Sequence, residues 1–159
     1  RMENSMKKLT RLYRPSSSKI ATKPAGFPLA SVTAIRNFEQ VDDEDYCDVV
    51  NYCVWLSGST PRECANLYFK NLFTDRLADA ITWTGSHGVM ALKGTRIVQA
   101  FEEAMKRNRK FPKINQAEFV HAMKRGLHCA KERVRKLHAA ARRRNEDEDS
   151  ENDEDEAMF

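Results

Sequence analysis

The sequence predicts an all-α fold: a compact bundle of about five or six helices with a long basic C-terminal helix and disordered ends. Apolar residues recur three or four positions apart through much of residues 27–137, which is the spacing of amphipathic helices. No segment alternates apolar and polar residues clearly enough to predict a strand. An apolar fraction of 41% suffices for one core only if much of the charge lies outside it. We therefore expect one helical domain with charged flanking segments.

Capping residues mark where the first predicted helices begin. Ser31 precedes apolar residues at i, i+3 and i+6 spacing and predicts a short helix. Acidic residues at 42–45 favour the positive end of a second helix, which the Ser-Gly-Ser run at 57–59 ends. Residues 60–63, Thr-Pro-Arg-Glu, form a capping box with proline at the first helical position. This box is the most specific local signal in the chain.

The second half of the predicted domain contains two shorter segments before the long helix. Thr74 is expected to begin a turn or short helix, which the glycine-containing loop at 85–88 ends. Thr95 is expected to cap a further helix, and Pro112 ends that region.

A long helix is predicted from Asn115 onward. Its apolar residues alternate three and four positions apart, as in a coiled-coil seam: Val120, Met123, Leu127, Ala130, Val134 and Leu137. Gly126 is expected to be its weak point, because glycine has a low helix propensity. The seam continues beyond what a domain of this size needs to cover. Val134 and Leu137 are therefore candidates for contact with a second copy of the chain.

Charge divides the chain into four segments. The net charge of +4 is uneven, because the last fifteen residues hold nine of the 23 acids and no Lys or Arg. The remaining residues carry all 27 Lys and Arg against 14 acids, a net charge of +13. We expect a disordered basic arm or linker at 1–26, a helical domain at 27–137, a basic helix extension at 138–144 and a disordered acidic tail at 145–159.

Cysteine and histidine spacings indicate neither a metal site nor catalysis. The cysteines fit no paired CxxC site and no dense disulfide framework, so free structural thiols in a reducing compartment are expected: Cys47, Cys53, Cys64 and Cys129. None of the four histidines lies in a zinc or catalytic motif. No apolar run reaches 18 residues. We expect no enzyme activity, no metal or other cofactor, no small-molecule substrate and no membrane partner.

One segment resembles a known family. The residues that carry this resemblance are the run NLFTDRLA at 71–78, Trp83-Thr84-Gly85, Gly88, Ala91-Leu92 and Ile97. They resemble the domain of unknown function numbered 4806, whose start is similar to Phe27-Pro28-Leu29, over roughly residues 27–137. That family has no established activity. The same order of residues is more distantly similar to BEN domains, which are all-helical modules of nuclear proteins that bind DNA or partner proteins. This second resemblance implies a nuclear location and binding to DNA or chromatin.

Two groups of cations are candidates for contact with phosphates. Lys93 and Arg96 flank the expected start of a helix, where backbone N–H groups could meet a phosphate, although an ordinary N-cap also explains Thr95. On the long helix, four cations are expected to project away from the apolar seam: Lys124, Arg125, Lys131 and Arg135. A solvated basic face is the alternative interpretation. Trp55 and Trp83 are expected in the core, although Trp83 could instead present its ring to a base.

The expected function is a non-enzymatic DNA- or chromatin-binding module of a nuclear protein. The alternative is a protein-interaction module that forms a homodimer, or binds a nuclear protein partner, through the seam of the long helix. The choice between DNA and RNA stays open. The acidic tail is expected to compete with nucleic acid for the basic helix, and phosphorylation of Ser150 would strengthen that competition. A tail that only keeps the protein soluble is the alternative.

Overall fold

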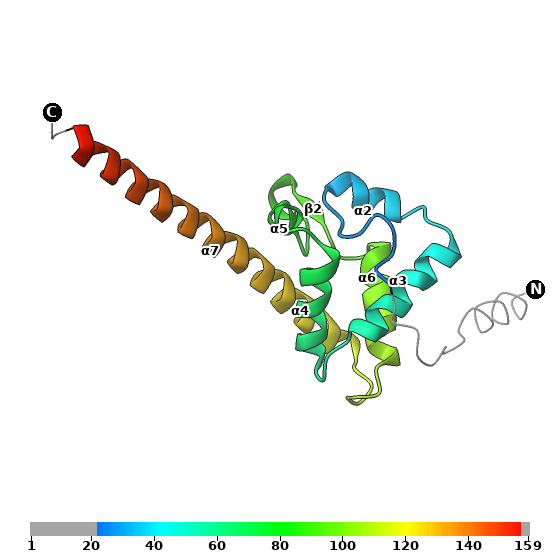
Figure 1. The fold of residues 1–159 in the computed structure, drawn as a ribbon. Coiled ribbons are helices and arrows are strands. Elements are labelled where there is room, and N and C mark those ends of the chain that lie inside the picture. Colours follow the sequence, from blue (N-terminus) through cyan, green and yellow to red (C-terminus); the bar gives the residue numbers. More distant parts are fainter. Residues whose placement is uncertain (1–21, 157–159) are drawn as a thin grey trace, which may run out of the picture.

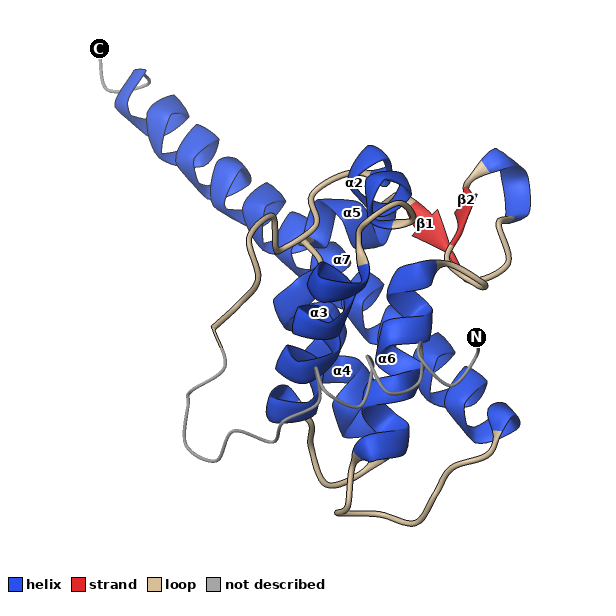
Figure 2. Ribbon diagram, turned by 90° about the vertical axis from the view of Figure 1, so that its right-hand side faces the viewer, coloured by secondary structure: helices blue, strands red, loops and turns tan. Residues whose placement is uncertain are grey.

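The computed structural model describes residues 22–156, apart from the side chains of His87 and of residues 149–156. The all-α prediction is confirmed, since six α-helices dominate this part of the chain (Figures 1 and 2). The helices are α2 (Val32–Phe38), α3 (Asp43–Leu56), α4 (Pro61–Leu72), α5 (Asp75–Asp79), α6 (Arg96–Arg107) and α7 (Gln116–Glu156). The shorter elements are β1 (Ile81–Thr82), the 3-10 turn η1 (Ser86–Gly88) and β2 (Met90–Ala91).

The predicted caps of the first helices are present as hydrogen bonds. The Ser31 hydroxyl accepts from the Ala34 N–H at 3.2 Å. The Thr60 hydroxyl accepts from the Glu63 N–H at 3.2 Å, while the Glu63 carboxylate accepts from the Ser59 N–H at 2.8 Å. These bonds satisfy backbone donors that a helix start leaves without partners, so the starts follow from local sequence.

The core is built from two packed helix pairs. Helix α6 runs alongside α3, and α4 packs against both α6 and α7. Aromatic rings join these pairs: Tyr68 of α4 stacks on Phe101 of α6 with centroids 5.0 Å apart, and Phe69 meets Phe101 edge to face at 6.2 Å. The Tyr68 hydroxyl lies 2.7 Å from the Ser57 hydroxyl, so its buried oxygen has a hydrogen-bond partner. Burial raises the pKa of Tyr68 above its ordinary value.

Gly126 lies close against α4 and is not only a weak point of the long helix. A Cβ at this position would lie 2.9 Å from the Ala65 Cβ and 2.9 Å from Cδ2 of Phe69. Both distances are shorter than a van der Waals contact between carbon atoms. The absence of a side chain therefore sets the spacing of the two helices.

A minimal parallel strand pair was not predicted. Ile81 pairs with Met90 and Thr82 with Ala91, and the connection between them passes through η1. Gly85 allows this tight connection because its φ is 79°, a conformation that residues with a Cβ rarely adopt. Strands of two residues are too short to show an alternating pattern, so the sequence contains no signal for them.

The two tryptophans differ in burial. Trp83 follows β1 and is 8% exposed, which confirms a place in the core. Trp55 is 53% exposed on α3, so its predicted core position is wrong. Its ring lies 5.8 Å from the ring of Tyr52 and covers that side chain from outside. Cys53 and Cys64 are buried and Cys47 and Cys129 half-buried, all as free thiols.

Helix α7 extends past the segment expected to be helical. It continues to Glu156, whereas residues 145–159 were expected to form a disordered tail. Glu146, Asp147 and Glu148 each follow an arginine by four positions, a spacing that supports helices, and no glycine or proline interrupts residues 127–156. Burial ends at Val134, and the following turns project from the body (Figure 1). Residues 1–21 of the expected arm and 157–159 of the expected tail lie outside the described residues.

Candidate nucleic-acid interface

Two carboxylates from outside α6 contact its first residue, Arg96. The Arg96 N–H donates to Oε1 of Glu39 at 2.8 Å, across a sequence separation of 57 residues. The Arg96 guanidinium donates to the Val41 carbonyl at 2.6 Å and pairs with Asp43 at 3.4 Å. It also lies 4.9 Å from the centre of the Tyr46 ring. Arg96 therefore joins α6 to the α2–α3 connection and does not present its charge to a ligand.

The neighbouring Thr95 does not cap α6 with its side chain. Its hydroxyl donates to the Leu92 carbonyl at 2.7 Å, and Glu39 accepts the Arg96 N–H in its place. Lys93 is exposed in the connection between β2 and α6. The phosphate site expected around Lys93 and Arg96 is therefore not assembled. A partner 57 residues away in sequence gives no local signal, which is why the cap could not be predicted.

Helix α7 instead presents one continuous row of basic side chains. Alternating steps of four and three residues place six side chains along one side of the helix: Lys124, His128, Lys131, Arg135, His138 and Arg142. Lys131 is half-buried and the other five are exposed. We call these six residues the basic row. At about 1.5 Å per residue, the row covers about 27 Å along the helix axis.

Charge around the basic row is strongly one-sided. Between residues 124 and 144 the chain holds nine Lys and Arg and one acid, Glu132. Glu132 accepts from Arg135 at 2.6 Å, and both side chains reach solvent. An exposed ion pair of this kind contributes little to stability and exchanges readily with other anions. Within residues 124–144 the positive charge therefore has little local compensation, and the nine acids of the same helix follow beyond Arg144.

Arg125 lies beside the basic row and lines a small cleft. This cleft, with a volume of about 370 Å³, lies between the start of α4 and α7 and includes Arg62, His121 and Glu118. Spacing along the chain does not group Arg62 with the cations of α7, because only the packing of α4 against α7 brings them together. Arg62 thus adds positive charge near the body end of the basic row.

The two residues expected at an oligomer interface have different environments. Val134 is 5% exposed within this single chain, so it belongs to the contact of α7 with its own body. The prediction that Val134 contacts a second copy is therefore wrong. Leu137, one turn further, is 57% exposed and is the last large apolar residue of the seam. Only Leu137 of this pair is accessible to a partner.

The acidic segment continues the axis of the basic row. Because α7 is a single helix, residues 146–156 extend beyond Arg144 and do not fold back over Lys131 or Arg135. Residues 135 and 151 are separated by about 24 Å along such a helix. Competition by this segment within one chain would require the helix to break. Ser150 lies in α7, and its side chain is outside the described part of the structure.

The described residues form neither a metal-binding cluster nor a membrane-spanning helix. Among them, no cluster of three or more His, Cys, Asp and Glu side chains is arranged to hold a metal ion. No helix in the same part of the chain is both long and apolar enough to span a membrane. The chain matches none of the protein-family models, curated proteins or solved structures compared with it. The case for a function therefore depends on the geometry and charge of α7.

Proposed function

We propose that this protein is a non-enzymatic module of a nuclear protein that binds DNA or chromatin through the basic row of α7. The observation that supports this proposal is the row itself: six basic or histidine side chains along one exposed side of a projecting helix. Lys and Arg that contact phosphates release condensed counterions, which is the main source of affinity in binding that is not sequence-specific. We expect phosphate contacts to dominate, since the row offers charges rather than a set of base-reading amides.

The length of the row suits a nucleic-acid backbone. A span of about 27 Å corresponds to most of one turn of B-DNA, about 34 Å. The helix is free of the body beyond Val134, so its outer turns can approach a duplex without a clash with the bundle. Lys124 and Lys131 lie nearer the body, where the cations around Arg125 and Arg62 add to the potential.

Salt dependence of duplex binding tests the proposal. The full chain is titrated into a fluorescent duplex of about 20 base pairs, and the dissociation constant is measured by anisotropy between about 50 and 200 mM salt. The test variant combines Lys124→Ala, Lys131→Ala, Arg135→Ala and Arg142→Ala. The control variant removes the same charge at exposed positions off α7: Arg36→Ala, Lys93→Ala, Arg109→Ala and Lys110→Ala.

The two variants should separate clearly. Loss of four phosphate contacts lowers the slope of log affinity against log salt by about 3 to 4, because each contact contributes about 0.9. The control should keep most of the slope. If both variants weaken binding equally, net charge and not the basic row is responsible. A single-stranded RNA of equal charge in the same assay separates DNA from RNA preference.

Exposed Leu137 supports a second candidate function, homodimerisation through α7. A large apolar side chain that is 57% exposed at the end of a buried seam is a plausible contact for another helix. An apolar contact resists salt, whereas phosphate contacts weaken steeply with it. Sedimentation of the full chain and of Leu137→Glu at high salt tests this candidate: a dimer that the substitution abolishes supports it, and a monomer in both cases refutes it.

A further inference from the structure

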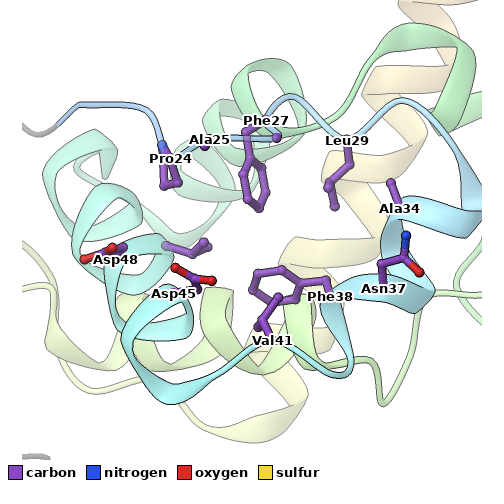
Figure 3. Close-up of a pocket in the computed structure, with 12 residues that line it drawn as sticks. Pro24, Ala25, Phe27, Leu29, Ala34, Asn37, Phe38, Val41, Asp45 and Asp48 are labelled. Carbon is purple, nitrogen blue, oxygen red and sulfur yellow. The ribbon is translucent and has the colours of Figure 1, made fainter.

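An apolar groove lies away from the basic row, where the chain enters the bundle. It has a volume of about 430 Å³ and lies between residues 24–29, α2 and the first turns of α3. Figure 3 shows Phe27 and Leu29 on one side of the groove and Phe38 and Val41 on the other. The rings of Phe27 and Phe38 meet edge to face at 5.9 Å. A space of this size can take several apolar side chains of a peptide.

The rim of the groove is acidic. Asp45 and Asp48 line it from α3 and lie one helical turn apart (Figure 3). Two neighbouring carboxylates are engaged elsewhere, since Asp42 accepts from the Asp45 N–H at 2.8 Å and Asp43 pairs with Arg96. Among the described side chains, no salt bridge involves Asp45 or Asp48. The groove thus combines an apolar floor with two carboxylates that form no ion pair with a cation of the described residues.

We infer that this groove is a docking site for residues 6–14 of the same chain. That segment, Met-Lys-Lys-Leu-Thr-Arg-Leu-Tyr-Arg, contains four apolar residues, four cations and no acid. Its apolar residues are spaced like anchors for one groove, at Met6, Leu9 and Leu12 with the adjacent Tyr13. Its cations match the charge of the rim. Burial of the apolar side chains supplies most of the affinity, and the charges orient the segment.

The length of chain between the segment and the groove permits this contact. Pro24 and Gly26 line the groove, so it lies within a few residues of the first described residue, Thr22. Nine residues lie between Arg14 and Pro24, and the ten steps of chain from one to the other span up to about 33 Å, which is enough for the segment to double back. Pro15 and the serines at 16–18 are residues that favour turns. Attachment at this distance gives an effective concentration on the order of millimolar, so even modest contacts suffice.

Zero-length carbodiimide crosslinking of the full chain, read by peptide mass spectrometry, tests the inference. Docking predicts crosslinks from the amines of Lys7 and Lys8 to Asp45 and Asp48. Lys106 and Glu102, whose charged atoms lie 3.1 Å apart, provide an internal standard for the reaction. The variant Leu9→Ser with Leu12→Ser keeps every charge and should reduce the docking crosslinks about tenfold relative to the standard, because it removes apolar anchors. Met2→Ser with Ile20→Ser is the matched control and should leave them unchanged.

Three outcomes overturn the inference. The first is a standard crosslink without any crosslink from Lys7 or Lys8 to the rim. The second is a set of docking crosslinks that Leu9→Ser with Leu12→Ser does not reduce, which means charge attraction without docking. The third comes from an equal mixture of chains labelled with different nitrogen isotopes: crosslinks between labels show that the arm of a second copy occupies the groove. Circular dichroism of each variant verifies that the helices are retained.

Discussion

Replacement of Gly126 by alanine is the sharpest test of the packing between α4 and α7. On helix propensity alone, this substitution should stabilise the protein by about 1 kcal/mol, because alanine is the better helix former. The structure predicts the opposite sign. The added methyl group would lie 2.9 Å from the Cβ of Ala65 and from Cδ2 of Phe69, nearly 1 Å inside ordinary contact.

Neither neighbour can move independently. The Cβ of Ala65 is fixed to the backbone of α4, and the Phe69 ring is held by Phe73 at 5.3 Å and by Phe101 at 6.2 Å. Helix α7 must therefore move away from α4 and loosen the contacts around it. Overpacking of this kind costs about 1–3 kcal/mol. After the gain in propensity, we expect a net loss of up to about 2 kcal/mol and a melting temperature lower by up to roughly 10 °C.

Thermal and urea unfolding followed by circular dichroism measures this effect. Ala140→Gly, on the exposed part of α7, is the control that calibrates the cost of glycine in this helix without any packing change. Ala65→Gly combined with Gly126→Ala should destabilise the protein by less than the sum of the two single substitutions, since it removes one of the two close contacts. If Gly126→Ala raises the free energy of unfolding by the amount that Ala140→Gly lowers it, α4 and α7 do not approach closely at this position and the reasoning fails.

Three further predictions concern other parts of the molecule. Glu39→Gln with Asp43→Asn should lower the free energy of unfolding by about 0.5–1 kcal/mol in denaturant titrations, because the group that caps the Arg96 N–H and the exposed partner of its guanidinium both lose their charge; an unchanged value would mean that these contacts are dispensable. Because burial raises the pKa of Tyr68, the folded protein keeps this hydroxyl protonated while the unfolded chain ionises it, so stability should be constant below about pH 10 and fall above it. Tyr68→Phe should weaken that fall, and an identical alkaline profile would contradict this assignment. Removal of residues 145–159 should tighten duplex binding at low salt and Ser150→Glu should weaken it slightly, through repulsion; anisotropy that detects neither change indicates that the acidic segment only maintains solubility.

Local sequence signals predicted the fold well where the cause is local. The starts of α2, α3 and α4 depend on side chains three residues from the donors they cap, so capping residues were sufficient to find them. The apolar spacing of α7 also identified its buried residues, including Met123, Leu127 and Ala130. The C-terminal end of α7 was predicted at residue 144 and lies twelve residues later, at Glu156. A block of acids is typical of disorder by composition, but glutamate is also a good helix former.

The candidate site was predictable only in part. Lys124, Lys131 and Arg135 share one side of α7, as the helical period requires. Arg96 was assigned to the wrong role because its partners lie 53 to 57 residues away in sequence. The same limit explains Trp55 and Gly126, since composition does not reveal whether a neighbouring helix covers a ring or approaches a backbone. The environments of these three residues depend on contacts between helices, which the pattern within each helix does not predict.

The sign of the charge reverses along the projecting part of α7, so the two ends of this part interact oppositely with a charged partner. Cations near the body are followed by carboxylates at the far end, with residues 136 and 151 about 22 Å apart along the axis. A polyanion attracts one end of such a rod and repels the other. A duplex would therefore meet the helix at an angle, with the outer end turned away, and the bundle would take one orientation relative to the nucleic-acid axis. Reversing the order of the two charged blocks along α7, with composition unchanged, should turn the bundle to face the other way.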